Sequence, residues 1–412
     1  MRESLVRRLR RWVAYRVVSA LVHQPLLLRL AACALRQWPW LGPRLGVVAR
    51  RGAVVGVFER DTAFSNTSHA PNLPAGEFVI GLESCPRQAA ERVLVASLLP
   101  SESSFAAAAA QESRRRIQAL REGPTRRFDL IDDYLVPVAW QALRPAFGAA
   151  APDVSPGDPL FAHLRAVGAH LIVGSVATEP VQRRALASGA QINACVRERL
   201  PQLLDAWQGA APNQPPALLA RTAVGMMWVA HPATVQAGAL LMQELLARQP
   251  IHRALARKAQ ALADPWGDAT LRDELRAHVL ELLRFRPPFP ILVRELARDA
   301  RYESEGASPR AKAGSRMTLL TIGALFDPLA RDERPTNAYR PGRGFKEPAD
   351  HYLVFGHGAR HCPARHQVVE TLVSALAGLL TLPGLRSGDA WPWRRVYEGP
   401  TITRMRLKFK QG

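Results

Sequence analysis

The chain has 412 residues, of which 48% are hydrophobic and 22% are charged, and its formal net charge is +20. This length and apolar content can support a large hydrophobic core, while four scattered cysteines are too few for a disulfide framework or a zinc site and favour a reducing compartment. The positive charge favours an anionic partner, but the arginines are spread along the chain and no nucleic-acid-binding motif occurs, so we expect no nucleic acid.

Residues 1–412 are expected to form a single domain, because no Gly/Ser-rich linker or repeat divides the chain. The first 45 residues form a basic, helical segment in which Arg16, His23 and Arg29 recur too often for a membrane span or a signal peptide. Two interpretations of this segment stand: a helix packed on the core, or an amphipathic helix on anionic lipid. The second would bring a cytoplasmic protein to the inner face of the membrane.

Helical periodicity dominates the chain, and two short extended runs, Gly52–Phe58 and Met317–Thr321, are expected to form a minor sheet.

The longest apolar stretch runs from about Leu218 to Ala247, and its length alone would permit a membrane span. His231, Pro232 and Gln236 interrupt its middle. We therefore predict a helix that crosses the core of a large soluble protein.

A further helix is predicted from Thr270 to Phe285, because apolar residues recur at helical spacing until Pro287 and Pro288 end the pattern. Glu281 and Arg284 lie three residues apart and share a face of this helix. If exposed, such an ion pair would contribute only about 0.2–0.5 kcal/mol.

The sequence Phe-Gly-His-Gly-Ala-Arg-His-Cys-Pro begins at Phe355. Gly356 and Gly358 can take positive φ, so this loop can turn sharply and direct backbone N–H groups toward the sulfur of Cys362. Pro363 suits the first position of a helix, and an apolar helical pattern follows it. Cys362 is therefore predicted at the positive end of a helix dipole, which suits a thiolate that binds a metal.

This run resembles the cysteine-ligand loop of the cytochrome P-450 family, whose pattern is Phe-Gly-x-Gly-x-Arg/His-x-Cys. The resemblance implies a mainly α fold with a minor β-sheet region, in which haem b (iron protoporphyrin IX) lies between the central helix and the cysteine-ligand helix. It implies that Cys362 is the axial thiolate ligand of the iron. Phe355, Gly356 and Arg360 are then expected to contact the haem. Ala364 departs from the family, which usually has glycine at this position.

The same resemblance gives the Glu281–Arg284 pair a structural role. In the family, Glu-x-x-Arg is followed by a meander that carries a second arginine, and Arg343 stands in the matching place. These three residues are expected to form a structural lock near the haem. A buried carboxylate shared by two guanidinium groups needs several hydrogen bonds to offset its desolvation.

The family resemblance also indicates which residues are expected on the distal side of the haem. Residues 246–253 are similar to the end of the family's central helix, which places Thr234 over the iron. The acid that normally precedes this threonine is replaced by Ala233, so the usual acid–alcohol relay of protons to dioxygen is incomplete.

His231-Pro232 resembles, one residue out of register, the Arg-Pro of the family's fatty-acid peroxygenases. In the alternative interpretation, Pro232 kinks the helix and His231 bonds a carbonyl that the kink frees. Thr234 and His231 are thus the candidate catalytic residues.

Two further segments resemble propionate-binding parts of the family. Arg294 follows the Glu-x-x-Arg helix at the place where relatives have a propionate-binding arginine. Gln88 and Arg92 stand where relatives bring a histidine and an arginine to the other propionate.

The resemblance implies a haem-thiolate monooxygenase that inserts one oxygen atom from O2 into a hydrophobic small molecule. Electrons are expected from a separate acidic ferredoxin, docked near Arg343, Lys346 and Arg365, and the enzyme is expected to be a monomer. Two alternatives stay open: a peroxide-driven fatty-acid peroxygenase or hydroperoxide isomerase, and a haem protein that senses a ligand or carries electrons without turnover. The sequence does not identify the substrate.

Overall fold

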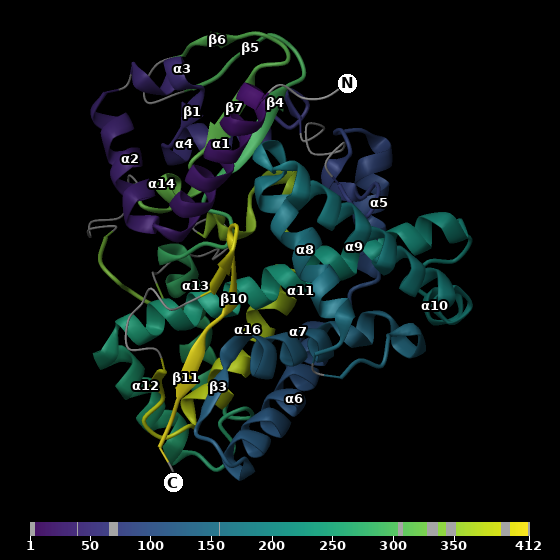
Figure 1. The fold of residues 1–412 in the computed structure, drawn as a ribbon, viewed down its shortest axis with the longest axis vertical. Coiled ribbons are helices and arrows are strands. Elements are labelled where there is room, and N and C mark those ends of the chain that lie inside the picture. The colour runs from purple at the N-terminus through teal and green to yellow at the C-terminus, as the bar shows by residue number, and fades with distance from the viewer. Residues whose placement is uncertain are drawn as a thin grey trace.

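The computed structural model describes residues 5–38, 40–65, 73–155, 157–303, 308–327, 337–342, 352–388 and 396–410. Helices dominate this part of the chain, as predicted, and the strands are short (Figure 1). The helices are α1 (Leu5–His23), α2 (Pro25–Gln37), α3 (Leu41–Leu45), α4 (Arg51–Glu59), α5 (Pro86–Ser97), α6 (Glu102–Glu122), α7 (Val136–Leu143), α8 (Pro159–Val173), α9 (Glu179–Glu198), α10 (Leu200–Trp207), α11 (Pro216–Ala247), α12 (Gln249–Ala261), α13 (Ala269–Phe285), α14 (Thr321–Leu325) and α16 (Arg365–Leu380).

The strands form small sheets around this helical body. The largest has four strands in the order β1-β7-β4-β2, with β1 and β7 parallel and the other neighbours antiparallel. A three-stranded sheet has the order β3-β11-β8, and β9 pairs with β10 and β5 with β6. The strands are β1 (Val47–Val48), β2 (Phe64–Ser65), β3 (Arg127–Asp129), β4 (Leu292–Leu296), β5 (Ala300–Arg301), β6 (Arg310–Ala311), β7 (Arg316–Leu319), β8 (Arg386–Ser387), β9 (Val396–Glu398), β10 (Thr401–Arg404) and β11 (Arg406–Lys408).

One of the two predicted strands is wrong. The run Gly52–Phe58 lies in helix α4, whereas most of the run Met317–Thr321 lies in β7, as expected. In α4 the buried residues are Ala53, Val54, Val57 and Phe58, a spacing that puts them on one helical face. Packing of that face against α14 outweighs the preference of valine for strands.

Helix α11 crosses the middle of the molecule, and most of its residues from Leu219 to Leu246 are buried (Figure 1). The prediction of a core helix is therefore confirmed. Pro232 lies inside α11 and touches α8, where a Cβ added to Gly168 would lie 2.7 Å from Cγ of Pro232. Glycine at this position lets the two helices approach closely.

Two clusters of buried side chains make up the core. The larger joins α5–α13 to α16 and β11, and the smaller joins α2 and α4 to the four-stranded sheet and α14. Val354 and Tyr339 pack against both clusters. The segment that leads into the Cys362 loop thus lies where the two clusters meet.

Among the described residues no single helix is both long and apolar enough to cross a bilayer. Two pairs of helices reach that length and composition only when taken together, and each pair is bent, by 98° between α1 and α2 and by 53° between α5 and α6.

Candidate functional site

The loop that carries Cys362 is folded tightly before α16. The N–H of Cys362 donates to the carbonyl of Phe355 (2.8 Å), which closes the loop. Gly356 and Gly358 have φ of 74° and 66°, so the positive φ predicted for both glycines is confirmed. A Cβ on Gly358 would lie 2.9 Å from the carbonyl oxygen of Phe58, at the end of α4. The loop therefore requires glycine there for its backbone angle and its close packing.

Helix α16 begins at Arg365, with Ala364 as its N-cap, and not at Pro363 as predicted. Pro363 lies in a turn before the helix, because the chain still has to leave the closed loop. The Cys362 sulfur remains on the N-terminal side of α16 and accepts a backbone hydrogen bond from Ala364. Burial raises the pKa of the Cys362 thiol, while this hydrogen bond, Arg92 and Arg365 lower it.

The surroundings of Cys362 suit a metal that brings ligands of its own. Within the described ranges, no group of three or more His, Cys, Asp or Glu residues could hold a metal ion. Cys362 therefore belongs to no cluster of metal ligands in these ranges, and a cationic metal would be needed to keep its buried sulfur as a thiolate. An iron held by the ring nitrogens of a porphyrin meets both conditions.

A cluster of buried arginines lies beside the loop. Arg360 pairs with Asp61, each side chain being 7% exposed, and Nη2 of Arg360 also donates to the carbonyl of Leu82 (2.8 Å). Arg294 is buried next to this pair, and burial together with Arg360 lowers the pKa of Arg294 to about 10, while Asp61 raises it. Two buried guanidinium groups thus lie near one carboxylate, which is paired with Arg360.

Among the described residues, this cluster holds more positive than negative charge. Nη1 of Arg360 and Oδ2 of Asp61 are buried and have no hydrogen-bond partner in the described part of the chain. The one side-chain hydrogen bond found for Arg294 goes to the carbonyl of the preceding residue, Val293 (3.0 Å). A buried surplus cation with an unsatisfied N–H is costly, and an anionic ligand group such as a carboxylate would satisfy it.

Helix α5 brings the other predicted propionate residues close to the loop. Nη2 of Arg92 donates to the carbonyl of His361, the residue before Cys362. Burial lowers the pKa of Arg92, whereas Cys362 raises it. Gln88 is buried one turn earlier on α5. The structure therefore brings Arg92 and Arg294, which are far away in the sequence, to the loop that carries Arg360 and Cys362.

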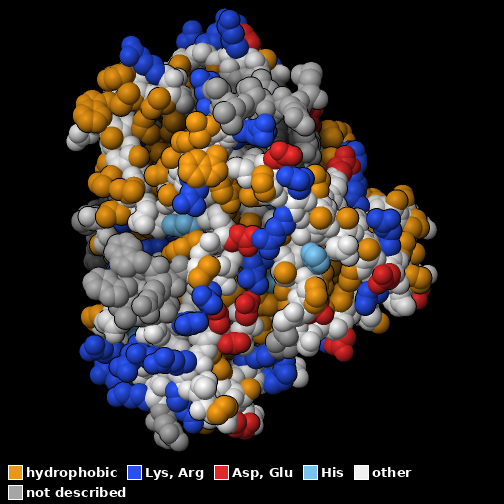
Figure 2. Space-filling view, viewed as in Figure 1, with side chains coloured by type: hydrophobic (Ala, Val, Ile, Leu, Met, Phe, Trp, Pro, Cys, Tyr) orange, Lys and Arg blue, Asp and Glu red, His pale blue; other side chains and the backbone are white. Residues whose placement is uncertain are grey.

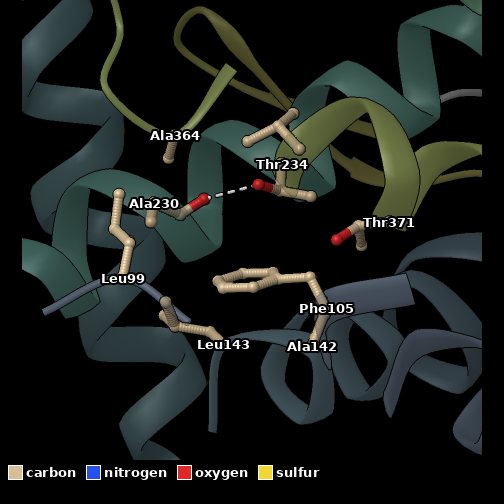
Figure 3. Close-up of a pocket in the computed structure, with 10 residues that line it drawn as sticks. Leu99, Phe105, Ala142, Leu143, Ala230, Thr234, Ala364 and Thr371 are labelled. Carbon is tan, nitrogen blue, oxygen red and sulfur yellow. Dashed lines mark hydrogen bonds between the residues drawn. The ribbon is translucent and has the colours of Figure 1, made fainter. Parts of the chain in front are cut away.

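A small cavity lies between α11 and the start of α16, with about 20 Å³ open to the centre of a water molecule (Figure 3), far less than the ~300–1,000 Å³ of small-molecule sites. Thr234 lines it from α11, where its Oγ1 donates to the carbonyl of Ala230 (2.8 Å), and Ala364 lines it from the other side. None of its lining residues is charged: Leu99, Phe105, Ala139, Ala142, Leu143, Ala230, Thr234, Ala364, Val368 and Thr371.

His231 does not line this cavity. Its ring stacks on Phe161 of α8, with 5.2 Å between the ring centroids and 20° between the planes, and it meets the edge of Trp140 of α7. Nε2 of His231 lies 3.1 Å from the carbonyl of Val136. That carbonyl belongs to a neighbouring helix, so His231 does not bond a carbonyl freed by Pro232, as the alternative interpretation had it.

The Glu281–Arg284 pair is buried rather than exposed. Glu281 is 0% and Arg284 3% exposed, and two hydrogen bonds of 2.8 and 2.9 Å join them. The backbone N–H of Arg340 also donates to Glu281 (2.8 Å), while Arg284 donates to carbonyls of Leu325 and Ala338 (3.2 Å each). The third member of the predicted lock, Arg343, lies outside the described residues, as does Lys346 of the predicted docking site.

Sequence reasoning missed Asp61, the carboxylate that pairs with Arg360. It follows α4 and stands 299 residues before Arg360, with nothing in its surrounding sequence to mark it. Its burial, at 7% exposure, is the signal that identifies it, and burial is a tertiary property.

No protein-family model matches the chain, and no match was found among curated proteins. Solved structures do match it. The ligand-free structure of cytochrome P450 TbtJ1 is 19% identical with a TM-score of 0.70, and the match covers 92% of this chain and 97% of that one. The P450 haem domain of Tepidiphilus thermophilus is 18% identical with a TM-score of 0.66, covering 92% and 94%. P450BioI, solved with acyl carrier protein ligated to hexadec-9Z-enoic acid, is 14% identical with a TM-score of 0.66, covering 88% and 92%.

Proposed function

Because the chain has the cytochrome P450 fold, we propose that it is a haem-thiolate monooxygenase, which inserts one oxygen atom from O2 into a hydrophobic small molecule. The observation that carries the proposal is that Cys362 lies near buried arginines, of which Arg360 has an N–H without a partner in the described part of the chain, and beside a small apolar cavity. When bound, haem would supply the activation of dioxygen, which no protein side chain can perform.

Each residue of the site has a defined part in this proposal. The Cys362 sulfur would bind the iron. Arg360, whose buried Nη1 has no hydrogen-bond partner in the described part of the chain, and the neighbouring Arg294 would hold one carboxylate of the haem edge. Arg92 would hold the loop through the carbonyl of His361 and add positive charge near the sulfur. The uncharged lining of the small cavity would favour an apolar group of a substrate over a charged one.

The net charge of the chain and the apolar lining of the cavity support an electron donor and a substrate class. A formal net charge of +20 would attract an acidic electron donor, such as a ferredoxin. The fatty acyl group in the structure of P450BioI supports a lipid-like substrate for a cavity lined by Leu99, Phe105 and Leu143.

The spectrum of the reduced carbon-monoxide complex tests the ligand. Wild-type protein loaded with haem should show the red-shifted band of thiolate ligation, and Cys362→Ser should abolish it because a hydroxyl donates far less charge to the iron. Cys33→Ser, which changes an exposed cysteine, is the matched control and should keep the band. An unchanged band in Cys362→Ser would move the ligand elsewhere and refute the proposed site.

A second candidate function is a peroxide-driven peroxygenase or hydroperoxide isomerase. Ala233 at the acid position and the absence of charge from the cavity lining favour it, because neither feature supplies protons for dioxygen chemistry. His231, packed between α7 and α8, is not placed to hold a peroxide. The carboxylate of a bound fatty acid would have to do so.

Thr234→Ala separates these two functions when product is measured with a reductase system and with peroxide. If the protein is a monooxygenase, the variant should form less product for each electron consumed. Thr234 carries the hydroxyl next to Ala233, the position where the family has an acid, and loss of a proton-transfer group typically costs ~10²–10⁴-fold in rate. A peroxygenase should keep its peroxide-driven rate. Thr371→Ala removes another hydroxyl from the cavity wall and serves as the control. No product from wild type with either oxidant would favour a haem sensor or electron carrier.

A further inference from the structure

The exposed hydrophobic side chains of the protein are concentrated in its N-terminal helices. Among the described residues, thirteen large hydrophobic side chains are exposed, and ten of them lie between positions 9 and 45. Hydrophobic side chains gather over the region of α1 and α2, with lysines and arginines beside them (Figures 1 and 2). We call the ten exposed hydrophobic residues of positions 9–45 the N-terminal patch.

Helix α1 is held to the protein by one face and presents an apolar stripe on another. Nε2 of His23 lies 2.8 Å from the carbonyl of Gly399, and the ring of His23 contacts that of Tyr397, with 3.9 Å between the centroids and 45° between the planes. The exposed residues of α1 include Trp12, Val13 and Val17, which recur at helical spacing on its outer side. A solvent-facing stripe of this kind is the reverse of the usual amphipathic pattern.

Helix α2 and the segment after it extend this surface. Leu28 and Leu35 of α2 are buried in the smaller core cluster, whereas Leu26, Leu27 and Leu30 are 51–60% exposed. Trp38 and Trp40 are exposed just beyond α2, and Trp40 has the guanidinium of Arg44 4.9 Å from its ring centroid. Tryptophan and arginine together are typical of surfaces that enter the head-group region of a bilayer.

The N-terminal segment itself carries charges of a single sign. Between Glu3 and Glu59 the sequence has ten arginines and no Asp or Glu. Arg8, Arg10 and Arg11 are exposed at the start of α1, next to the apolar stripe. A partner must therefore be both apolar and anionic. A second copy of the chain would oppose two surfaces of like charge, which disfavours a dimer through this patch.

We propose that the N-terminal patch is a docking surface for an anionic lipid bilayer. The leucines and tryptophans of the patch enter the interface between head groups and acyl chains, and the arginines at its edge pair with lipid phosphates. The 98° angle between α1 and α2 fits a contact that lies on the membrane rather than crossing it. This proposal does not depend on haem or on the proposed reaction.

Flotation of the purified full-length protein with lipid vesicles tests the proposal. The wild-type protein should float with vesicles that contain phosphatidylglycerol and far less with vesicles of phosphatidylcholine alone, and salt should weaken the binding. Leu27→Ser with Leu30→Ser should weaken binding by about tenfold for each leucine that enters the lipid. Arg8→Gln and Arg10→Gln should each weaken it by roughly fivefold.

Leu186→Ser is the matched control, because Leu186 on α9 is as exposed as the patch leucines and lies far from them in the sequence. It should bind like wild type. Because all of these positions are exposed, the variants should keep the wild-type melting temperature, which is measured alongside. Equal binding by the wild type and the double leucine variant, or no binding to either type of vesicle, would overturn the proposal. Self-association without lipid that the double leucine variant abolishes would also overturn it and assign the patch to a dimer.

Discussion

At the scale of single residues, the environment of a side chain decides its chemistry more than its type does. Cys362 and His231 both belong to residue types that serve as metal ligands or proton carriers. Burial raises the pKa of the Cys362 thiol, but Cys362 also lies beside arginines and a backbone N–H that favour the thiolate, so a metal cation there would complete its stabilisation. His231 lies among aromatic rings, where a charge cannot be stabilised.

The titration of His231 gives a prediction about stability against pH. Burial, opposed by the hydrogen bond to Val136 and assisted by Arg165, lowers the pKa of His231 to about 4, whereas an unfolded chain has an ordinary histidine. Between the two pKa values the unfolded state binds a proton that the folded state does not, so the folded state loses stability as pH falls.

We therefore expect His231→Gln to lose about 2 kcal/mol less in free energy of unfolding than wild type between pH 7 and pH 5. Urea unfolding at the two pH values measures this. His163→Gln, which replaces a partly buried histidine on α8 bonded to Ser188, is the control. Equal losses in wild type and His231→Gln would show that His231 takes up its proton as readily in the folded as in the unfolded protein, and would contradict the prediction.

At the scale of elements, the Glu281–Arg284 pair ties α13 to segments far along the chain. Its hydrogen bonds reach the end of α14 and residues 338–340, which precede the Cys362 loop. Because both side chains are buried, removing one leaves the other charged and unpaired. This contact therefore holds three segments in place rather than one turn of helix.

Glu281→Ala should lower the free energy of unfolding by about 3–5 kcal/mol, the usual cost of breaking a buried ion pair. Thermal and urea unfolding measure the loss, and haem content after expression with haem supply gives a second measurement. Glu274→Ala on the same helix breaks an ion pair with Lys258 that is largely exposed, and should cost no more than about 1 kcal/mol. Equal stability of the two variants would contradict a structural lock.

At the scale of the whole molecule, charge is the property that no single element explains. The formal net charge is +20, and the sequence pI is about 11.0. Such a field raises the rate of encounter with anionic partners and is screened by salt. This positive field would attract both the proposed acidic electron donor and the proposed anionic lipid surface.

The rate of reduction by an acidic ferredoxin should therefore fall with ionic strength. Electrostatic steering is worth ~10–10³-fold in association rate, so we expect at least a tenfold loss between low salt and about 1 M salt. Stopped-flow reduction of the haem-loaded protein measures it. Reduction by an uncharged small reductant is the control and should change little. A ferredoxin rate that does not respond to salt would contradict docking by charge.

The sequence by itself determined the features that depend on local backbone geometry and periodicity. The positive φ of Gly356 and Gly358, the helix that carries Glu281 and Arg284, and the buried helix of residues 216–247 could all be predicted. Each follows from residues close together in the chain. The family resemblance, based on the Cys362 loop, also led to the correct fold.

Only the tertiary structure decided which distant residues meet and which way a side chain points. Asp61 pairs with Arg360 across 299 positions, and no pattern in the sequence encodes that contact. The run Gly52–Phe58 is helical because one helical face of it packs on α14, although its valines favour a strand. His231 faces α7 and α8 instead of the cavity because the two aromatic rings there bury it. Burial depends on packing between elements, and a linear pattern does not record it.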